Sequence, residues 1–106
     1  MKSFHTLTVG EQEYKLRLTA SAIIAIEKKL DKPIFVALDT VYENIVETIA
    51  TFLWGAIQSL DENFTYKMAL GLFDQYIDDG NSIDDLMLEI NTLLEVSGFF
   101  KRGQAV

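Results

Sequence analysis

Cysteine is absent from the 106-residue sequence, and histidine and proline occur once each. Without cysteine the chain can form no disulfide, thiolate zinc site or iron–sulfur cluster, and it has no cysteine nucleophile. Basic residues are also few: nine Lys and Arg stand against sixteen Asp and Glu, which gives a formal net charge of −7. That charge repels nucleic acid phosphates and anionic membrane surfaces, so we expect neither nucleic acid nor membrane as a partner.

A long apolar run is missing as well. The longest uncharged stretch of apolar character, residues 49–60, includes polar side chains and is shorter than the roughly 20 residues that cross a bilayer. The first residues lead into an alternating pattern rather than an apolar segment with a cleavage site, so no signal peptide is expected. The remaining composition, 49% hydrophobic and 24% charged, is that of an ordinary globular domain. We therefore expect a cytoplasmic protein.

Alternating apolar and polar residues predict a β-hairpin at the N-terminus. The two alternating runs, 4–9 and 13–18, are separated by Gly10-Glu11-Gln12, a short connection that contains glycine. Two strands alone are only marginally stable in water. One face of the hairpin is therefore expected to pack on the rest of the chain.

From Thr19 onward the apolar residues recur every three or four positions, which predicts helices near 20–30, 41–60, 65–79 and 83–97. The expected N-caps are Thr19 or Ser21, Asp39 or Thr40, Thr65, and Ser82 with Asp85. A short helical turn is expected at 34–38, after Pro33.

Together these patterns predict an α+β, mainly α fold, with an N-terminal two-stranded β-hairpin packed on a bundle of about four helices. Residues 1–98 are expected to form a single domain, with the hairpin at 1–18 and the helical part at 19–98, and residues 99–106 a C-terminal tail.

Two features are candidate sites of chemistry: the acidic stretch 78–85 and His5. The acidic residues do not fit the register of a calcium loop, and they favour a solvated helix–helix turn over a weak divalent site. His5 has no nucleophile or orienting acid nearby in sequence, so an ordinary strand residue is expected. We expect that the protein is not an enzyme and binds no cofactor. We also expect it to have no catalytic, cofactor-binding or metal-binding residues.

Two apolar features are candidates for partner binding. On a helical wheel Trp54 lies opposite the stripe formed by Ile45, Ile49, Phe52 and Ala56. Either the hairpin or the 34–38 turn covers it, or a partner does. Phe99-Phe100 follows the last helix and either folds back on the bundle or forms an exposed adhesive end. The candidate partner-binding residues are therefore Trp54, Phe99 and Phe100.

Two parts of the sequence resemble the tail assembly chaperones of long-tailed, siphovirus-type bacteriophages. At the N-terminal side they are Glu13-Tyr14-Lys15-Leu16-Arg17-Leu18-Thr19, Ala22-Ile23 and Ile26-Glu27-Lys28-Lys29-Leu30; at the other end stands Val96-Ser97-Gly98-Phe99-Phe100-Lys101. One departure follows Leu30, where Asp31-Lys32-Pro33 occupies the place of the usual glycine stop.

The resemblance implies a non-enzymatic protein of virion assembly that binds the tape measure protein and helps tail tube protein polymerise around it. It also implies a place in the host cytoplasm and absence from the mature virion. The residues leave open another small acidic protein-binding module, such as a secretion-type chaperone or a regulatory adaptor, and a homo-oligomer. An enzyme that uses the acids of 78–85 is a third, disfavoured interpretation.

The resemblance further implies a longer form of the protein, made by ribosomal frameshifting near the end of the reading frame. The pair Phe99-Phe100 permits slippage by one base if both codons begin with two uridines and the Gly98 codon ends in uridine. We predict such a heptamer in the gene and a longer product in mass spectra of phage-infected cells. A Gly98 codon with any other last base would rule out this heptamer.

Overall fold

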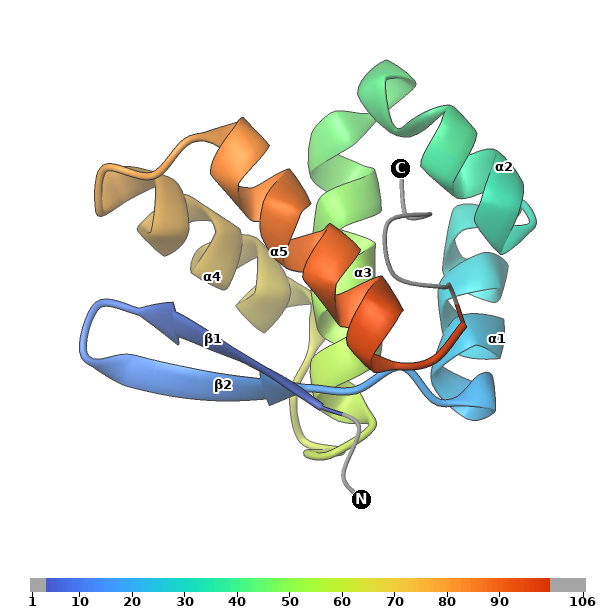
Figure 1. Cartoon of the computed structure of the whole chain (residues 1–106), viewed down its shortest axis with the longest axis horizontal. Helices are drawn as coiled ribbons and strands as arrows, with labels where there is room; N and C mark the ends of the chain where they lie inside the picture. Colours follow the sequence, from blue (N-terminus) through green and yellow to red (C-terminus); the bar gives the residue numbers. More distant parts are fainter. Residues whose placement is uncertain (1–3, 100–106) are drawn as a thin grey trace.

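The computed structural model describes residues 4–99, in which an antiparallel two-stranded hairpin precedes five α-helices and one 3-10 helix (Figure 1). This architecture confirms the predicted α+β, mainly α fold class, with one α-helix more than expected. No helix in the described range is long and apolar enough to cross a membrane. The elements are β1 (His5–Val9), β2 (Gln12–Leu16), α1 (Ala20–Leu30), α2 (Ile34–Asp39), the 3-10 helix η1 (Val41–Glu43), α3 (Ile45–Gln58), α4 (Tyr66–Asp78) and α5 (Ile83–Val96).

The hairpin forms where the alternation predicts it. Val9 pairs with Gln12, so the connection is two residues long, and Gly10 takes a positive φ of 62° that suits a residue without a side chain. One face is buried against the helices and the other is exposed, as expected for a sheet with a single covered face. The buried residues of this segment are Leu7, Val9, Leu16 and Leu18.

Side-chain caps set the starts of three helices. The Thr19 hydroxyl accepts a hydrogen bond from the Ala22 N–H at the start of α1, and Thr65 accepts one from Met68 at the start of α4. Ser82 and Asp85 form a reciprocal capping box at α5. These caps confirm three of the four predicted starts, because each satisfies N–H groups that the helix itself leaves unpaired.

Helix α1 ends at Asp31, which adopts the left-handed conformation with φ 56° and ψ 42°. Aspartate tolerates this conformation better than most residues, although glycine does so at lower cost. The next turn is held by Glu27, whose carboxylate accepts a hydrogen bond of 2.8 Å from the Ile34 N–H at the start of α2. Glu27 thus lies on the apolar side of α1 because it satisfies the backbone of the following helix.

The predicted 41–60 helix is wrong at both ends. Asn44, with φ −145° and ψ 63°, interrupts it, so residues 41–43 form η1 and α3 begins at Ile45. Thr40 does not cap α3, because it ends α2 and its hydroxyl donates to the Val36 carbonyl oxygen. At the other end Leu60 lies beyond the helix and is exposed.

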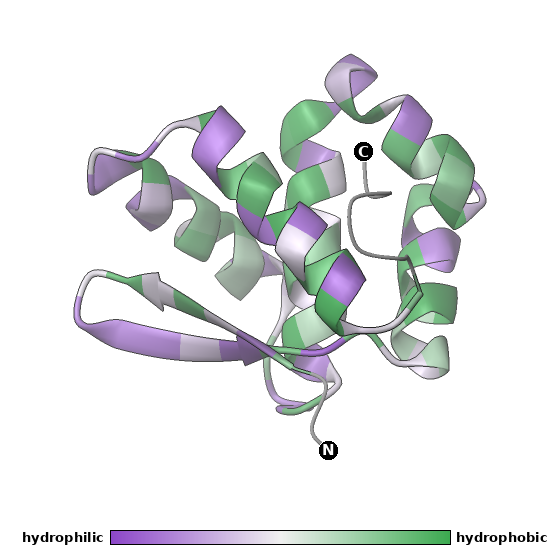
Figure 2. Ribbon diagram, viewed as in Figure 1, coloured by the Kyte–Doolittle hydropathy of each residue, from purple (hydrophilic) through white to green (hydrophobic). Residues whose placement is uncertain are grey.

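The predicted apolar stripe of α3 is largely buried, and so is much of the rest of the helix. α3 contacts α1, α4, α5, β2 and η1, and Figure 2 shows hydrophobic residues along most of its length. Small and polar residues outside the predicted stripe, Thr48, Thr51 and Gly55, are buried too. The Thr51 hydroxyl donates to the Glu47 carbonyl oxygen, which satisfies it within the helix. α3 is therefore the central element of the core.

Gly55 allows α1 to approach α3 closely. A Cβ atom placed on Gly55 would lie 2.7 Å from Cδ1 of Ile26, and nearer still to its Cγ1. Ile26 is fully buried in this contact. The α1–α3 packing therefore requires a residue without a side chain at position 55.

The segment after β2 joins the ends of two helices to the hairpin. The Arg17 N–H donates to the Ala56 carbonyl oxygen at 3.0 Å, and the Ser59 hydroxyl lies 2.8 Å from the Arg17 carbonyl oxygen. One residue on, the Leu18 N–H donates to the Ser97 hydroxyl. Residues 17–18 thus connect the last turn of α3 and the end of α5 to the same stretch of backbone.

We predict that Gly55→Ala lowers the free energy of unfolding by about 1–3 kcal/mol, because its methyl group overpacks the contact with Ile26. Gly71→Ala in α4 is the matched control. A Cβ there meets nothing within 4 Å, so this change should stabilise the helix by about 0.5–1 kcal/mol. Urea unfolding measures both. Equal stabilities of the two variants would contradict the α1–α3 packing.

Candidate partner-binding surface

The acidic stretch lies where two helices meet. Asp78 ends α4, while Asp84 and Asp85 stand in the first turn of α5, which confirms the predicted helix–helix turn. Among residues 4–99 no group of three or more His, Cys, Asp or Glu side chains is placed to hold a metal ion. Burial, and then the charges of Glu89 and Asp85, raise the pKa of the Tyr76 phenol.

His5 connects the hairpin to the last helix. Its Nε2 atom lies 2.5 Å from a carboxylate oxygen of Glu89 on α5, and both side chains are partly buried. The sequence predicted a strand position for His5 but not this partner, since 84 residues separate the two. The contact between His5 and Glu89 therefore links β1 to α5.

Trp54 is half-buried against the core and covered from α1. The ammonium group of Lys29 lies 5.7 Å from the centre of the Trp54 ring and 4.1 Å from that of Tyr66 at the start of α4. Lys29 is exposed, so its charge remains hydrated while its stem spans two aromatic rings. The sequence analysis had considered the hairpin and the 34–38 turn as covers, and neither supplies this contact.

Phe99 is 48% exposed, and Phe100 lies outside the described residues. Phe99 follows Ser97, which is bonded to Leu18 just before α1, whereas Trp54 lies by Lys29 near the end of α1. About ten helical residues, or ~15 Å, separate these two points along α1. The structure therefore does not bring Trp54 and Phe99 together into one site.

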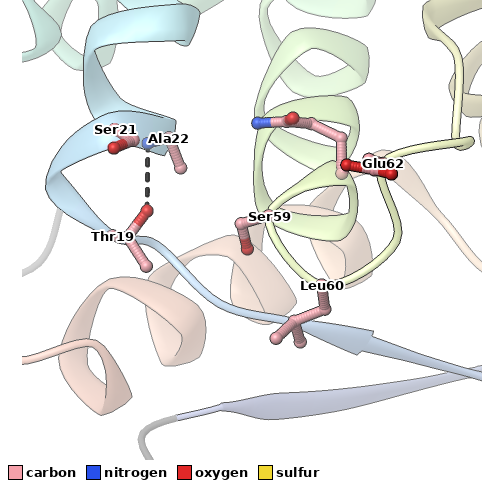
Figure 3. Close-up of a pocket in the computed structure, with 7 residues that line it drawn as sticks. Thr19, Ser21, Ala22, Ser59, Leu60 and Glu62 are labelled. Carbon is pink, nitrogen blue, oxygen red and sulfur yellow. Dashed lines mark hydrogen bonds between the residues drawn. The ribbon is translucent and has the colours of Figure 1, made fainter.

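An open polar hollow of about 520 Å³ lies between the start of α1 and the end of α3 (Figure 3). Two of its hydroxyl groups bind backbone: Thr19 caps α1, and Ser59 lies within 2.8 Å of the Arg17 and Ala56 carbonyl oxygens. The Gln58 amide donates to the Gly55 carbonyl oxygen. Thr19, Gln58 and Ser59 therefore use their polar groups to stabilise the fold.

A second hollow is predominantly apolar and runs along α4 beside the hairpin. We call it the α4 groove; it encloses about 510 Å³. Tyr14 of β2 and Phe64 form one wall with an edge-to-face contact, their ring centres 6.3 Å apart. Met68 on α4 is 51% exposed. The full lining is Gln12, Tyr14, Ile57, Asp61, Phe64, Met68, Gly71, Leu72 and Gln75.

Sequence reasoning missed the α4 groove for two reasons. Met68 follows the apolar periodicity of α4, which does not distinguish a core residue from one at the edge of the buried surface, and Met68 is exposed. Gly71 contributes no periodic signal, yet its missing side chain leaves the groove open. A glycine on the exposed side of a helix, beside an exposed methionine, was the available clue.

Four further exposed apolar side chains fall within twelve residues on α2, η1 and the first turn of α3. Phe35 and Tyr42 are 64% and 70% exposed, and Val36 and Val46 accompany them. Such density of exposed large hydrophobic residues is typical of interaction surfaces. Together with the α4 groove, this segment gives the protein more than one apolar surface.

The charges are distributed unevenly over the fold. Residues 39–99 contain twelve Asp and Glu and one basic residue, Lys67, whereas residues 15–32 contain five basic residues and two acidic ones. In Figure 1 the α1–α2 turn, with Lys28 and Lys32, lies at one end of the long axis and the α4–α5 turn at the other. The α4 groove therefore belongs to the acidic part of the molecule.

Residues 1–105 match the model of a family of unknown function, DUF6096, and the chain therefore belongs to that family. No curated protein and no solved structure matches the chain.

We predict that Trp54→Ala mainly destabilises the fold, by about 2–3 kcal/mol, because the half-buried ring packs on the core and a fully buried one would cost more. Phe99→Ala should leave the melting temperature nearly unchanged, since Phe99 follows the last helix and is largely exposed. Thermal unfolding and binding of the tape measure protein, the partner that the resemblance implies, are measured for both. A Trp54→Ala protein of normal melting temperature that fails to bind it would instead make Trp54 part of the interface.

Proposed function

We propose that this member of DUF6096 is a tail assembly chaperone of a long-tailed bacteriophage. It binds the tape measure protein, keeps it from self-associating, and assists tail tube protein in polymerising around it. The protein acts in the host cytoplasm without catalysing a covalent reaction, and it leaves before the virion is complete. This role extends the resemblance of its N-terminal and C-terminal segments to that class of chaperone.

The observation that carries the proposal is exposed apolar surface on a strongly acidic domain. Within residues 4–99, ten large hydrophobic side chains are exposed, among them Phe35, Tyr42, Met68 and Leu88. A long helical client exposes apolar stripes that would otherwise associate with one another. Apolar surface on the chaperone covers these stripes, and the net charge of −7 keeps the complex dispersed.

Reversible binding suits this function better than tight binding. Tail tube subunits must displace the chaperone as the tube grows, so its dissociation has to be fast compared with assembly. Exposed side chains such as Phe35, Tyr42 and Met68 favour this behaviour, because a few anchors on open surface bind weakly. A homo-oligomer would increase the apparent affinity without tightening any single contact.

Another small acidic binding module would present similar surfaces. A secretion-type chaperone or a regulatory adaptor shares the composition and needs no catalytic residues. The nature of the client distinguishes these alternatives, and a gene located beside tail genes favours the phage chaperone.

We predict that co-expression with the tape measure protein encoded in the same gene cluster gives a complex that co-purifies on a tag. The soluble amount of tape measure protein should rise several-fold, because its apolar stripes are covered. Quantitative gels of the soluble and pelleted fractions measure this.

The control is an unrelated acidic protein of similar size and net charge. If the tape measure protein is equally soluble with this control, and no complex is recovered with the chaperone, the proposed function is wrong.

A further inference from the structure

We infer that the α4 groove binds an amphipathic helix of the client, one that presents an apolar stripe and carries basic residues beside it. This inference rests on the proposed chaperone function, because it names the surface and the kind of segment that the chaperone would hold.

The groove has the length and direction of a helix-binding site. Its α4 side is lined by Met68, then the neighbours Gly71 and Leu72, and then Gln75, so lining residues recur after three or four positions, and Phe64 precedes the helix. From Met68 to Gln75 this row extends ~10 Å, about two helical turns. Anchors at three- and four-residue spacing on a second helix fit such a row, as in other helix-in-groove complexes.

Gly71 permits a close approach to α4. A Cβ at this position would meet nothing within 4 Å, so the space above it is open to a partner. Glycine in the middle of a helix lowers the stability of that helix. The free protein therefore loses some stability by having no side chain at position 71. The neighbouring Met68 side chain is flexible and adapts to apolar surfaces of different shape.

An extended segment fits the groove less well than a helix. The residues of β2 that line it, Gln12 and Tyr14, pair with Val9 and Leu7 of β1. Because a two-residue connection makes Val9 and Gln12 a hydrogen-bonded pair, the alternation directs the backbone groups of both lining residues towards β1. An extended client would find no backbone partners at these residues, whereas a helix satisfies its own N–H and C=O groups.

The charges around the groove favour a basic client. Asp61 is the charged residue of the lining. On a helical wheel the solvent side of the same α4 face carries Asp74 and Asp78 together with Lys67. The hairpin turn adds Glu11, and its Gly10 lies against Gln75 and Asp79. Lys and Arg beside the apolar stripe of the client would therefore be attracted at most of the rim.

The experiment uses the full chain and two model peptides of about 18 residues, long enough to form a helix on binding. Both peptides carry the same leucine stripe; one has lysines beside it, and the other has glutamates at the same positions. Fluorescence anisotropy measures their affinities. We expect the lysine peptide to bind at least about tenfold more tightly than the glutamate peptide.

Two substitutions at one position separate the groove from general attraction between opposite charges. Gly71→Gln should fill the groove with a polar side chain and weaken the lysine peptide about tenfold, while Gly71→Ala, which adds one methyl group, should change its affinity less than about threefold. Both substitutions favour the helix, so neither variant should unfold. Unchanged binding by Gly71→Gln would overturn the assignment.

Asp61→Asn tests the charge at the groove while keeping the local turn. The Asp61 carboxylate accepts a hydrogen bond from the Asn63 N–H, and an asparagine side chain accepts the same bond. We expect weaker binding of the lysine peptide and a smaller dependence on salt. Equal binding of the two peptides by the wild-type protein would overturn the basic preference.

The two proposals fail in different ways. If the tape measure protein co-purifies but Gly71→Gln still captures it and the peptide normally, the groove assignment is wrong and the chaperone function stands. If the lysine peptide binds the groove but no tape measure protein is captured, the groove stands and the identity of the client is wrong.

Discussion

The fold depends on the enclosure of α3, which is contacted by α1, α4, α5, β2 and η1. Enclosure on several sides requires small residues where neighbours come close, and Gly55 meets that requirement opposite Ile26. It also requires that polar groups inside be satisfied locally, as the hydroxyl of Thr51 is. The hairpin and α1, α4 and α5 cannot bury their apolar faces on one another alone, so each is stable only while α3 is in place.

Much of this architecture could be predicted from local signals. The alternation before Thr19 and the caps Thr65 and Ser82 depend on the nearest few residues, and the elements they mark formed within about two residues of expectation. The central helix could not be predicted as well, because enclosure is a property of the surrounding elements. Helical periodicity identified one face of α3, while the burial of Gly55 depends on the close approach of α1.

The candidate site was less accessible to sequence reasoning than the fold. An aromatic residue outside the apolar stripe of a helix indicates a candidate binding residue, yet Trp54 is half-buried beneath Lys29. The α4 groove arises between segments distant in sequence, Tyr14 of the hairpin and Phe64 with α4, so no local pattern marks it. Exposed methionine and glycine on a helix are weak signals separately. Met68 and Gly71 indicate a binding surface only once the structure places them beside the hairpin.

The backbone at residues 17–18 has a consequence for how the molecule opens. Its two N–H groups donate hydrogen bonds to the end of α3 and the end of α5. The hairpin therefore cannot separate from the helices without breaking the bonds to both helix ends. Slow amide exchange at Arg17 and Leu18 would then report unfolding of the whole domain, while groups on the outer face of the strands exchange through local fraying. A protein built this way keeps a cooperative interior while its outer surfaces bind and release a partner, which is what the proposed function requires.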